Sequence, residues 1–247
     1  MRVPDQAATG FAAAATAYQQ GRPTYPEALL AEISAERPLG PSSRLVDVGA
    51  GTGKFSALLA ETGAEVLAVE PVASMIRELA AAHPRVHAIN GEAHGLPFTA
   101  SSVDLISAAT AFHWFADDEA IAEFARVLKP GGLFALVSNR RDTDDPLGAA
   151  LEDVLTKRRP VDLSRQSSAD HLFARSALFT LARRADVPHV HQLLPEEVLA
   201  LALSMSYIAP TAAVREEVTA EVRAFLPDEG PVAIGYHALV TLYRRLA

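Results

Sequence analysis

Three glycines at alternating positions, Gly49, Gly51 and Gly53, separate a short apolar run from an amphipathic one. Glycine has no β-carbon, so a ligand can approach the backbone of such a turn closely, and a helix that begins after it offers unpaired amide groups. The next apolar run, 66–69, is followed by Glu70, whose carboxylate could bind ribose hydroxyls. Together these residues predict a nucleotide-type binding turn.

The spacing of the glycines indicates which nucleotide is bound. A dinucleotide fingerprint reads G-x-G-x-x-G, and its amides receive a pyrophosphate. This chain reads G-x-G-x-G, with Lys54 at the place of the last fingerprint glycine. Asp47, two residues before the turn, would repel a pyrophosphate but suits a cationic ligand such as the ammonium of an amino acid. The pattern favours S-adenosylmethionine over a dinucleotide.

The composition limits the possible classes of protein. The 247 residues, 49% of them hydrophobic, are enough for one sizeable α/β core. The 22 basic and 30 acidic residues give a net charge of −8, which disfavours a nucleic-acid partner. The chain has no cysteine, so disulfides and thiolate metal sites are excluded. No apolar leader and no apolar window of the roughly 18 to 20 residues that span a membrane is present, which predicts a soluble cytoplasmic protein.

The hydrophobic periodicity alternates between strands and helices in the first part of the chain. Helices are expected over 26–36, 53–61, 72–82 and 117–128, and strands over 44–48, 65–70, 85–90, 103–108 and 133–137. Asp117 is expected to cap the last of these helices, and the turn 129–132 to end it. These alternations predict a doubly wound α/β fold with a mostly parallel sheet.

The second part of the chain is less regular. A loop is expected at 142–146, then helical structure to about residue 184 with a polar interval at 164–170, and helices over 195–205 and 212–225. Strands over 187–194 and 232–242 bring the sheet to seven. We expect a single domain, 1–247, in which an arm and helix at 1–40 close the cofactor site and 139–226 supply a helical cap for the substrate.

Five motifs in order resemble the class I methyltransferases, in the small-molecule branch related to trans-aconitate methyltransferase and to ubiquinone-type methyltransferases. They are YQQGRPTYP at 18–26, VDVGAGTG at 46–53, NGEA at 90–93 with LPF at 96–98, AFHWF at 111–115, and RVLKPGG at 126–132. The segment SMSY at 204–207 is a weaker match. The resemblance covers most of the chain and implies a Rossmann-like fold with S-adenosylmethionine as cofactor.

The same resemblance implies a set of cofactor contacts. Glu70 would bind the ribose, Pro71 and Met75 would flank the adenine, and Glu92 with Ala93 would meet its polar edge. The methionine portion would lie against Gly49, Ala50, Gly51, Gly53 and Ala109, with Asp47 organising the turn, and Tyr18 and Arg22 would reach its carboxylate. Glu92 departs from the aspartate that is commoner at its position.

Each of these residues also has a purely structural interpretation. The glycines could serve only a tight turn, and Asp47 could satisfy loop amides. Met75 has the helical spacing of a core residue, and Arg22 could form a solvated salt bridge. His189 and His191 would project to one side of a strand, but without nearby acids no metal site is expected.

The acceptor site is the least defined part of the sequence. His113 follows the fourth strand, so it could remove a proton from the acceptor, orient Trp114 or lie against the cofactor. Trp114, Tyr207 and Tyr236 are candidates for lining the acceptor pocket, although either tyrosine could be a core residue.

The expected function is methyl transfer to a small-molecule acceptor, at a carboxylate or hydroxyl oxygen or an activated carbon. A protein that binds S-adenosylmethionine without transferring its methyl group, and an NAD(P)-dependent oxidoreductase, are the alternatives. The identity of the acceptor and the oligomeric state are left open.

Overall fold

The computed structural model describes residues 23–159, 166–205, 207–208 and 211–247, so Tyr18 and Arg22 lie outside the described residues. The described part contains one seven-stranded sheet. Its strands are β1 (Arg44–Val48), β2 (Glu65–Glu70), β3 (His87–Asn90), β4 (Val103–Ala109), β5 (Leu128–Arg141), β6 (Phe179–Leu193) and β7 (Val232–Arg245). Their order across the sheet is β3-β2-β1-β4-β5-β7-β6. Strand β7 is antiparallel to both of its neighbours, and the other pairs are parallel.

Helices cover both faces of this sheet, as the alternating periodicity predicts. One face is covered by α2 (Ala28–Glu36) and α3 (Lys54–Ala60), which bury Ile33 and Phe55 among the strands. The opposite face is covered by α5 (Asp118–Val127) and α7 (Gln166–Arg175). There Phe124 stacks on Phe134 with ring centroids 5.0 Å apart, and Phe173 stacks on Tyr243 at 3.9 Å. The doubly wound α/β fold is confirmed.

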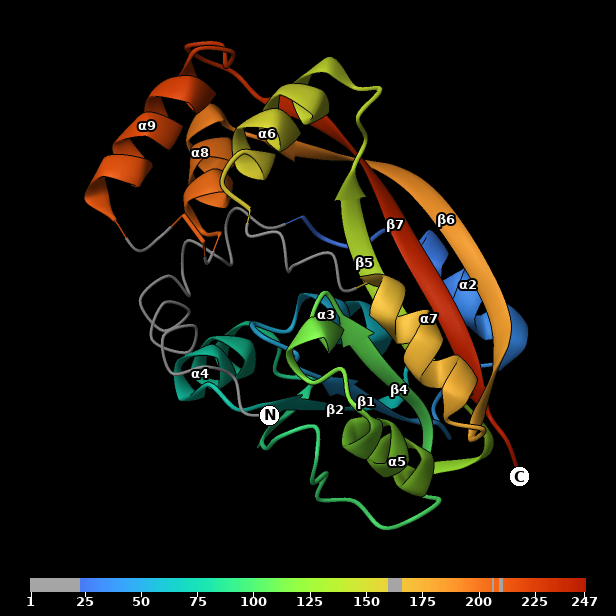
Figure 1. Cartoon of the computed structure of the whole chain (residues 1–247). Helices are drawn as coiled ribbons and strands as arrows, with labels where there is room; N and C mark the ends of the chain where they lie inside the picture. The colour runs from blue at the N-terminus through green and yellow to red at the C-terminus, as the bar shows by residue number, and fades with distance from the viewer. Residues whose placement is uncertain (1–22, 160–165, 206, 209–210) are drawn as a thin grey trace.

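A separate group of helices stands beyond the ends of the parallel strands. It consists of α6 (Pro146–Thr156), α8 (Pro195–Leu203) and α9 (Ala212–Arg223), which bury Leu151, Leu201 and Val218 against one another. Figure 1 shows them gathered at the end of the long strands β5, β6 and β7. The expected cap range 139–226 also contains β6 and α7, which belong to the sheet and its covering layer, so we limit the proposed cap to these three helices.

Several boundaries differ from the sequence-based expectation. The turn expected at 129–132 is part of β5, where the pairing with β4 shifts between Val103 and Leu105 and accommodates a bulge. Residues 179–184 form the start of β6 instead of a helix. Their pairing with β7, from Phe179 opposite Arg245 onward, overrides the helix propensity of the alanine, leucine and arginine residues at 181–184. Asp117 caps α5 as expected, because its Oδ1 accepts a hydrogen bond of 3.0 Å from the Ala120 amide.

Candidate active site

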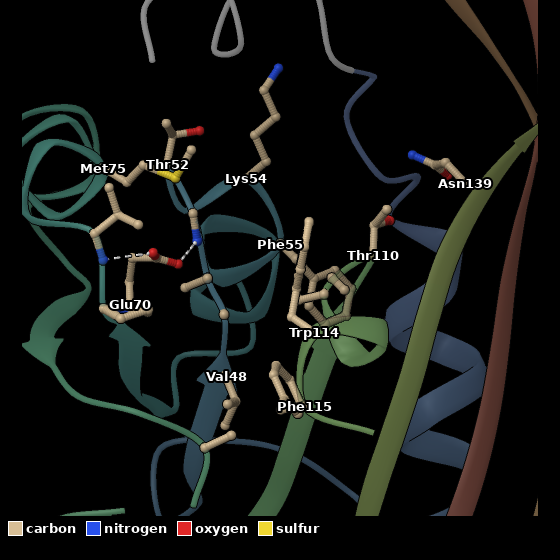
Figure 2. Close-up of a pocket in the computed structure, with 18 of the residues that line it drawn as sticks. Val48, Thr52, Lys54, Phe55, Glu70, Met75, Thr110, Trp114, Phe115 and Asn139 are labelled. Carbon is tan, nitrogen blue, oxygen red and sulfur yellow. Dashed lines mark hydrogen bonds between the residues drawn. The ribbon is translucent and has the colours of Figure 1, made fainter. Parts of the chain in front are cut away.

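A cavity lies at the carboxyl ends of the parallel strands, on both sides of β1. Strand β1 pairs with β2 on one side and with β4 on the other, so the direction of the chain connections reverses there. Such a switch point in an open α/β sheet leaves a crevice for a ligand. Figure 2 shows that Glu70 and Met75 line one side of this cavity, while Thr110 and Asn139 line the other.

The glycine turn forms the floor of the cavity. Gly49, with φ +68°, and Gly53, with φ +85°, both have left-handed backbone conformations that favour glycine. A β-carbon on Gly49 would lie 2.7 Å from the Ala111 Cβ, and one on Gly53 would lie 2.8 Å from the Leu79 Cγ. Gly49 and Gly51 line the cavity, whereas Gly53 faces α4 (Ala73–Ala82). The glycines are therefore required by the packing of the turn as well as by close approach to the cavity.

Glu70 is held rigidly at the end of β2. Its Oε2 accepts a hydrogen bond of 2.9 Å from the Gly51 amide, and its Oε1 accepts one of 2.9 Å from the Val72 amide, as the dashed lines in Figure 2 show. Burial raises the pKa of the Glu70 carboxyl, and the two amide bonds oppose that rise. Each carboxylate oxygen can accept a second hydrogen bond. Glu70 is thus positioned to bind two hydroxyls of a ligand in the cavity.

Asp47 lies beneath the turn and does not line the cavity. The Ser56 hydroxyl donates to its Oδ2 at 2.6 Å, and the Ser107 hydroxyl donates to its Oδ1 at 2.7 Å. The carboxyl therefore joins β1 to the first turn of α3 and to β4. Complete burial raises the pKa of Asp47 to about 6, although both serine hydrogen bonds lower it. This arrangement favours the structural interpretation of Asp47 over direct contact with a ligand.

Comparison with known proteins identifies the family. A family model for a methyltransferase domain matches residues 46–136. A Mycobacterium tuberculosis protein described as an uncharacterized methyltransferase is 36% identical over 228 residues, which are 90% of this chain and 88% of that protein. This chain belongs to the class I methyltransferase family.

Two further proteins, one with a solved structure and one found by sequence, are similar to this methyltransferase. A solved structure from Anaeromyxobacter dehalogenans, described as a type II methyltransferase, is 26% identical with a TM-score of 0.71, covering 91% of this chain and 98% of that one. The malonyl-[acyl-carrier protein] O-methyltransferase of Methylococcus capsulatus is 45% identical over 116 residues, or 44% of this chain and 41% of that protein. The matched domain ends before α6, α8 and α9, so it does not define the acceptor.

Most of the cofactor and substrate residues expected from the sequence line the cavity of the methyltransferase. They are Gly49, Ala50, Gly51, Glu70, Pro71, Met75, Glu92, Ala93, Ala109, Trp114 and Tyr236. Asp47, Gly53, His113 and Tyr207 do not line it. Met75 is both buried in the core, with 4% of its surface exposed, and part of the cavity wall, so the two interpretations of this residue are compatible.

His113 and His94 differ in their position relative to the cavity. His113 belongs to the short helix η1 (Phe112–Trp114), and its ring lies against Trp114 with centroids 4.7 Å apart. His94, which the sequence analysis did not select, lines the cavity and meets the Asp117 carboxylate at 3.0 Å through Nε2. Tyr207 hydrogen bonds to Arg159 in the group of α6, α8 and α9. The geometry therefore favours a role for His113 in supporting Trp114.

Several cavity residues were not selected from the sequence, although Tyr25 lies within the motif at 18–26. The hydroxyls of Tyr25 and Thr110 hydrogen bond to each other at 3.1 Å in the cavity lining, and the Asn139 side chain donates a hydrogen bond of 3.0 Å to the Thr24 carbonyl. Thr110 has φ +55°, which is uncommon for a β-branched residue. These contacts hold residues 23–25 over the ends of β4 and β5. The backbone conformation of Thr110 cannot be detected from the sequence. Lys54, in contrast, stands out in the sequence because it occupies the position of the last glycine in the dinucleotide fingerprint.

In the part of the chain that the structure describes, no group of His, Asp and Glu side chains is arranged to hold a metal ion. His189 instead meets the Asn139 side-chain oxygen at 3.1 Å through Nε2, and its ring stacks on Tyr236. Among the same residues, no helix has the length and apolar character needed to cross a bilayer.

The buried Asp47 predicts a pH dependence of stability. Because its pKa rises from 3.8 to about 6 on folding, the unfolded chain loses this proton first as the pH rises. The free energy of unfolding therefore falls across this window, by roughly 3 kcal/mol at about 1.36 kcal/mol per pH unit. We expect Asp47→Asn to lose this contribution, so that its free energy of unfolding relative to the wild type grows by that amount between pH 3.8 and pH 6.

Urea denaturation at a series of pH values measures this difference. Asp228→Asn, at an exposed position, is the matched control and should track the wild type. A constant difference between Asp47→Asn and the wild type over the whole window would contradict the prediction.

Proposed function

We propose that this protein binds S-adenosylmethionine at the glycine turn and transfers its methyl group to a small-molecule acceptor bound on the opposite side of the same cavity. The observation that carries the proposal is Glu70, a buried carboxylate fixed by the Gly51 and Val72 amides at the end of β2. Its position beside the glycine turn suits a ribose that carries its base toward α4 and its amino-acid portion along the turn.

The residues around Glu70 fit an adenosine. Val72 and Met75 offer an apolar surface for the flat faces of the base, and Glu92 and Ala93 lie beside it, where a base presents its polar edge. The turn at Gly49 and Gly51 has no side chain that would block the amino-acid portion. A dinucleotide fits less well, because Lys54 stands at the position of the last fingerprint glycine, where the backbone would have to approach a pyrophosphate closely.

Bound in this way, S-adenosylmethionine supplies a methyl group on a positively charged sulfur, and transfer to an acceptor leaves S-adenosylhomocysteine. The protein's part is to align the two reactants and to exclude water. Trp114 and Phe115 supply an apolar wall, and residues 23–25 cover the cavity from the side of β4 and β5. Thr110, Asn139 and Tyr236 contribute polar side chains to the lining on the side proposed for the acceptor.

Lys54 is the residue we assign to the amino-acid carboxylate of the cofactor. It is the first residue of α3, and its side chain lines the cavity and extends away from the turn in Figure 2. An ammonium at the start of a helix combines its own charge with that of the helix amides, so it favours an anionic group. Arg22, outside the described residues, remains a second candidate from the sequence.

His113 is not needed as a base in this arrangement, because its ring packs on Trp114 outside the cavity lining. We expect His113→Ala to keep kcat within about threefold and to leave the pH profile of kcat unchanged, whereas a lost general base would cost roughly 100-fold or more. Trp114→Ala, which removes part of the apolar cavity wall, should raise KM more strongly than His113→Ala does. Loss of the acidic limb of the profile in His113→Ala would restore His113 as a proton acceptor.

Calorimetry and an acceptor screen test the function itself. We expect S-adenosylhomocysteine to bind with 1:1 stoichiometry and NAD not to bind. A screen with labelled methyl donor should then show S-adenosylhomocysteine accumulating with at least one small acceptor. Tight NAD binding without S-adenosylhomocysteine binding would establish the oxidoreductase alternative. Cofactor binding without any transfer would establish the alternative of a non-methylating protein.

A further inference from the structure

Apart from Lys54, which follows the glycine turn, the acidic and basic side chains that line the cavity are divided between its two sides. Within the described residues, the carboxylates of Glu70 and Glu92 lie on the side proposed for the nucleoside. Arg141, the last residue of β5, lines the opposite side, where Leu201 of α8 also reaches the cavity. The side proposed for the acceptor therefore has a cation in its wall and no carboxylate among the described lining residues.

The pairing of the strands fixes the position of Arg141. Arg141 on β5 lies directly opposite Tyr236 on β7, and Tyr236 lies directly opposite His189 on β6. Side chains in register across neighbouring strands point to the same face of a sheet. The guanidinium thus belongs to a polar row across three strands, and 11% of its side-chain surface is exposed.

Arg141 shares its carboxylate partner with a second arginine. Its Nε and Nη2 both donate to Oε2 of Glu152 on α6, at 2.7 Å for Nε. The other oxygen of Glu152, Oε1, accepts from Nη2 of Arg159 at 2.7 Å. Two guanidinium groups therefore face one carboxylate, and the cluster of Arg141, Glu152 and Arg159 carries one excess positive charge.

The next acids along the chain form their contacts elsewhere and do not pair with Arg141 or Arg159. Asp145 caps α6, because its Oδ2 accepts from the amides of Gly148 at 2.9 Å and Gly235 at 3.1 Å. The Asp142 carboxylate lies 3.8 Å from His237, whose side chain points to the sheet face opposite that of Tyr236. In the described part of the chain, Arg141 hydrogen bonds only to Glu152, through its Nε–Nη2 edge.

We propose that Arg141 anchors an oxyanion group of the acceptor, a carboxylate or a phosphate, away from the atom that receives the methyl group. This inference rests on the proposed function and adds the chemical class of the acceptor. A guanidinium has a second edge, Nη1–Nη2, that can bind an oxyanion with two parallel hydrogen bonds. Such a ligand supplies the missing negative charge, which a half-buried excess cation requires. Tyr207, bonded to Arg159, then supports the anchor from outside the cavity.

Matched pairs of anionic and neutral probes test this inference on the full chain saturated with S-adenosylhomocysteine. The pairs are benzoate with benzamide, succinate with succinamide, and phenyl phosphate with phenol, with binding measured by calorimetry. We expect at least one anion to bind tenfold or more tightly than its neutral partner, and the best pair distinguishes carboxylate from phosphate. Arg141→Gln should abolish that preference while S-adenosylhomocysteine binds within twofold of the wild type.

A second variant separates charge recognition from structural support. Glu152→Gln removes the shared carboxylate and leaves two guanidinium groups, so anion affinity should rise about threefold to tenfold, whereas a merely structural role of the cluster predicts a loss. Arg158→Gln is the matched control, because Arg158 binds Glu221 at 2.5 Å outside the cavity lining, and it should leave all affinities unchanged. Circular dichroism establishes that each variant is folded.

The outcomes separate this inference from the proposed function. If S-adenosylhomocysteine does not bind, the proposed function fails first. If it binds and no anion is preferred over its neutral partner, because both bind alike or neither binds, the oxyanion anchor is wrong. A fall in anion affinity in a folded Glu152→Gln variant would also overturn it.

Discussion

Replacing Glu70 with alanine is expected to weaken the binding of S-adenosylhomocysteine by about 100-fold or more. The carboxylate is fixed by the Gly51 and Val72 amides and can accept two further hydrogen bonds from a ribose. A hydrogen bond to a charged group contributes about 1.5–3 kcal/mol, so loss of two such bonds corresponds to at least two orders of magnitude in affinity. Calorimetric titration of the variant measures the effect directly.

The folding of the Glu70→Ala variant should be affected far less than its ligand binding. Burial already disfavours the charged form of Glu70, as its raised pKa indicates, so removal of the carboxylate also removes a desolvation cost. Glu65→Ala, at the other end of β2, is the control, because Glu65 pairs with Arg44 at the surface and does not line the cavity. A loss of affinity below fivefold for Glu70→Ala would exclude Glu70 as the main ribose ligand.

The nucleoside side of the cavity was predictable because local sequence encodes it. The turn at Gly49–Gly53 directly follows β1 and the acid Glu70 is the last residue of β2, and the hydrophobic runs of both strands have clear ends. The parallel pairing of these strands then brings the two segments together without any long-range information.

The acceptor side could not be predicted in the same way. Arg141 and Tyr236 meet because β5 pairs with β7, nearly one hundred residues later in the chain, and no short motif records this pairing. The helix-forming composition around Arg183 also concealed the first part of β6, whose edge position depends on β7. His113 was chosen by its place after β4, but sequence position does not determine that η1 directs its ring against Trp114.

A methyl group added at Gly49 is expected to destabilise the protein by about 2–5 kcal/mol and to prevent cofactor binding. An alanine at φ +68° carries a left-handed strain of about 1–2 kcal/mol. Its β-carbon would also lie 2.7 Å from the Ala111 Cβ, and overpacking of this kind adds about 1–3 kcal/mol. Urea denaturation of Gly49→Ala measures the sum. Gly63→Ala measures the strain alone, because Gly63 has φ +77° and its nearest neighbour to a new β-carbon, Pro41 Cγ, is 3.6 Å away.

The clash with Ala111 can be separated from the strain by a second substitution. In the double variant Gly49→Ala with Ala111→Gly, the β-carbon that causes the clash is absent, so the loss in free energy of unfolding should be smaller than the sum of the two single losses by about 1–3 kcal/mol. Strictly additive losses would mean that Ala111 moves aside and that Gly49 is required only for its backbone conformation. Because Gly49 and Ala111 both line the cavity, recovery of stability together with S-adenosylhomocysteine binding would show that the close packing of β1 against the segment after β4 shapes the cofactor site.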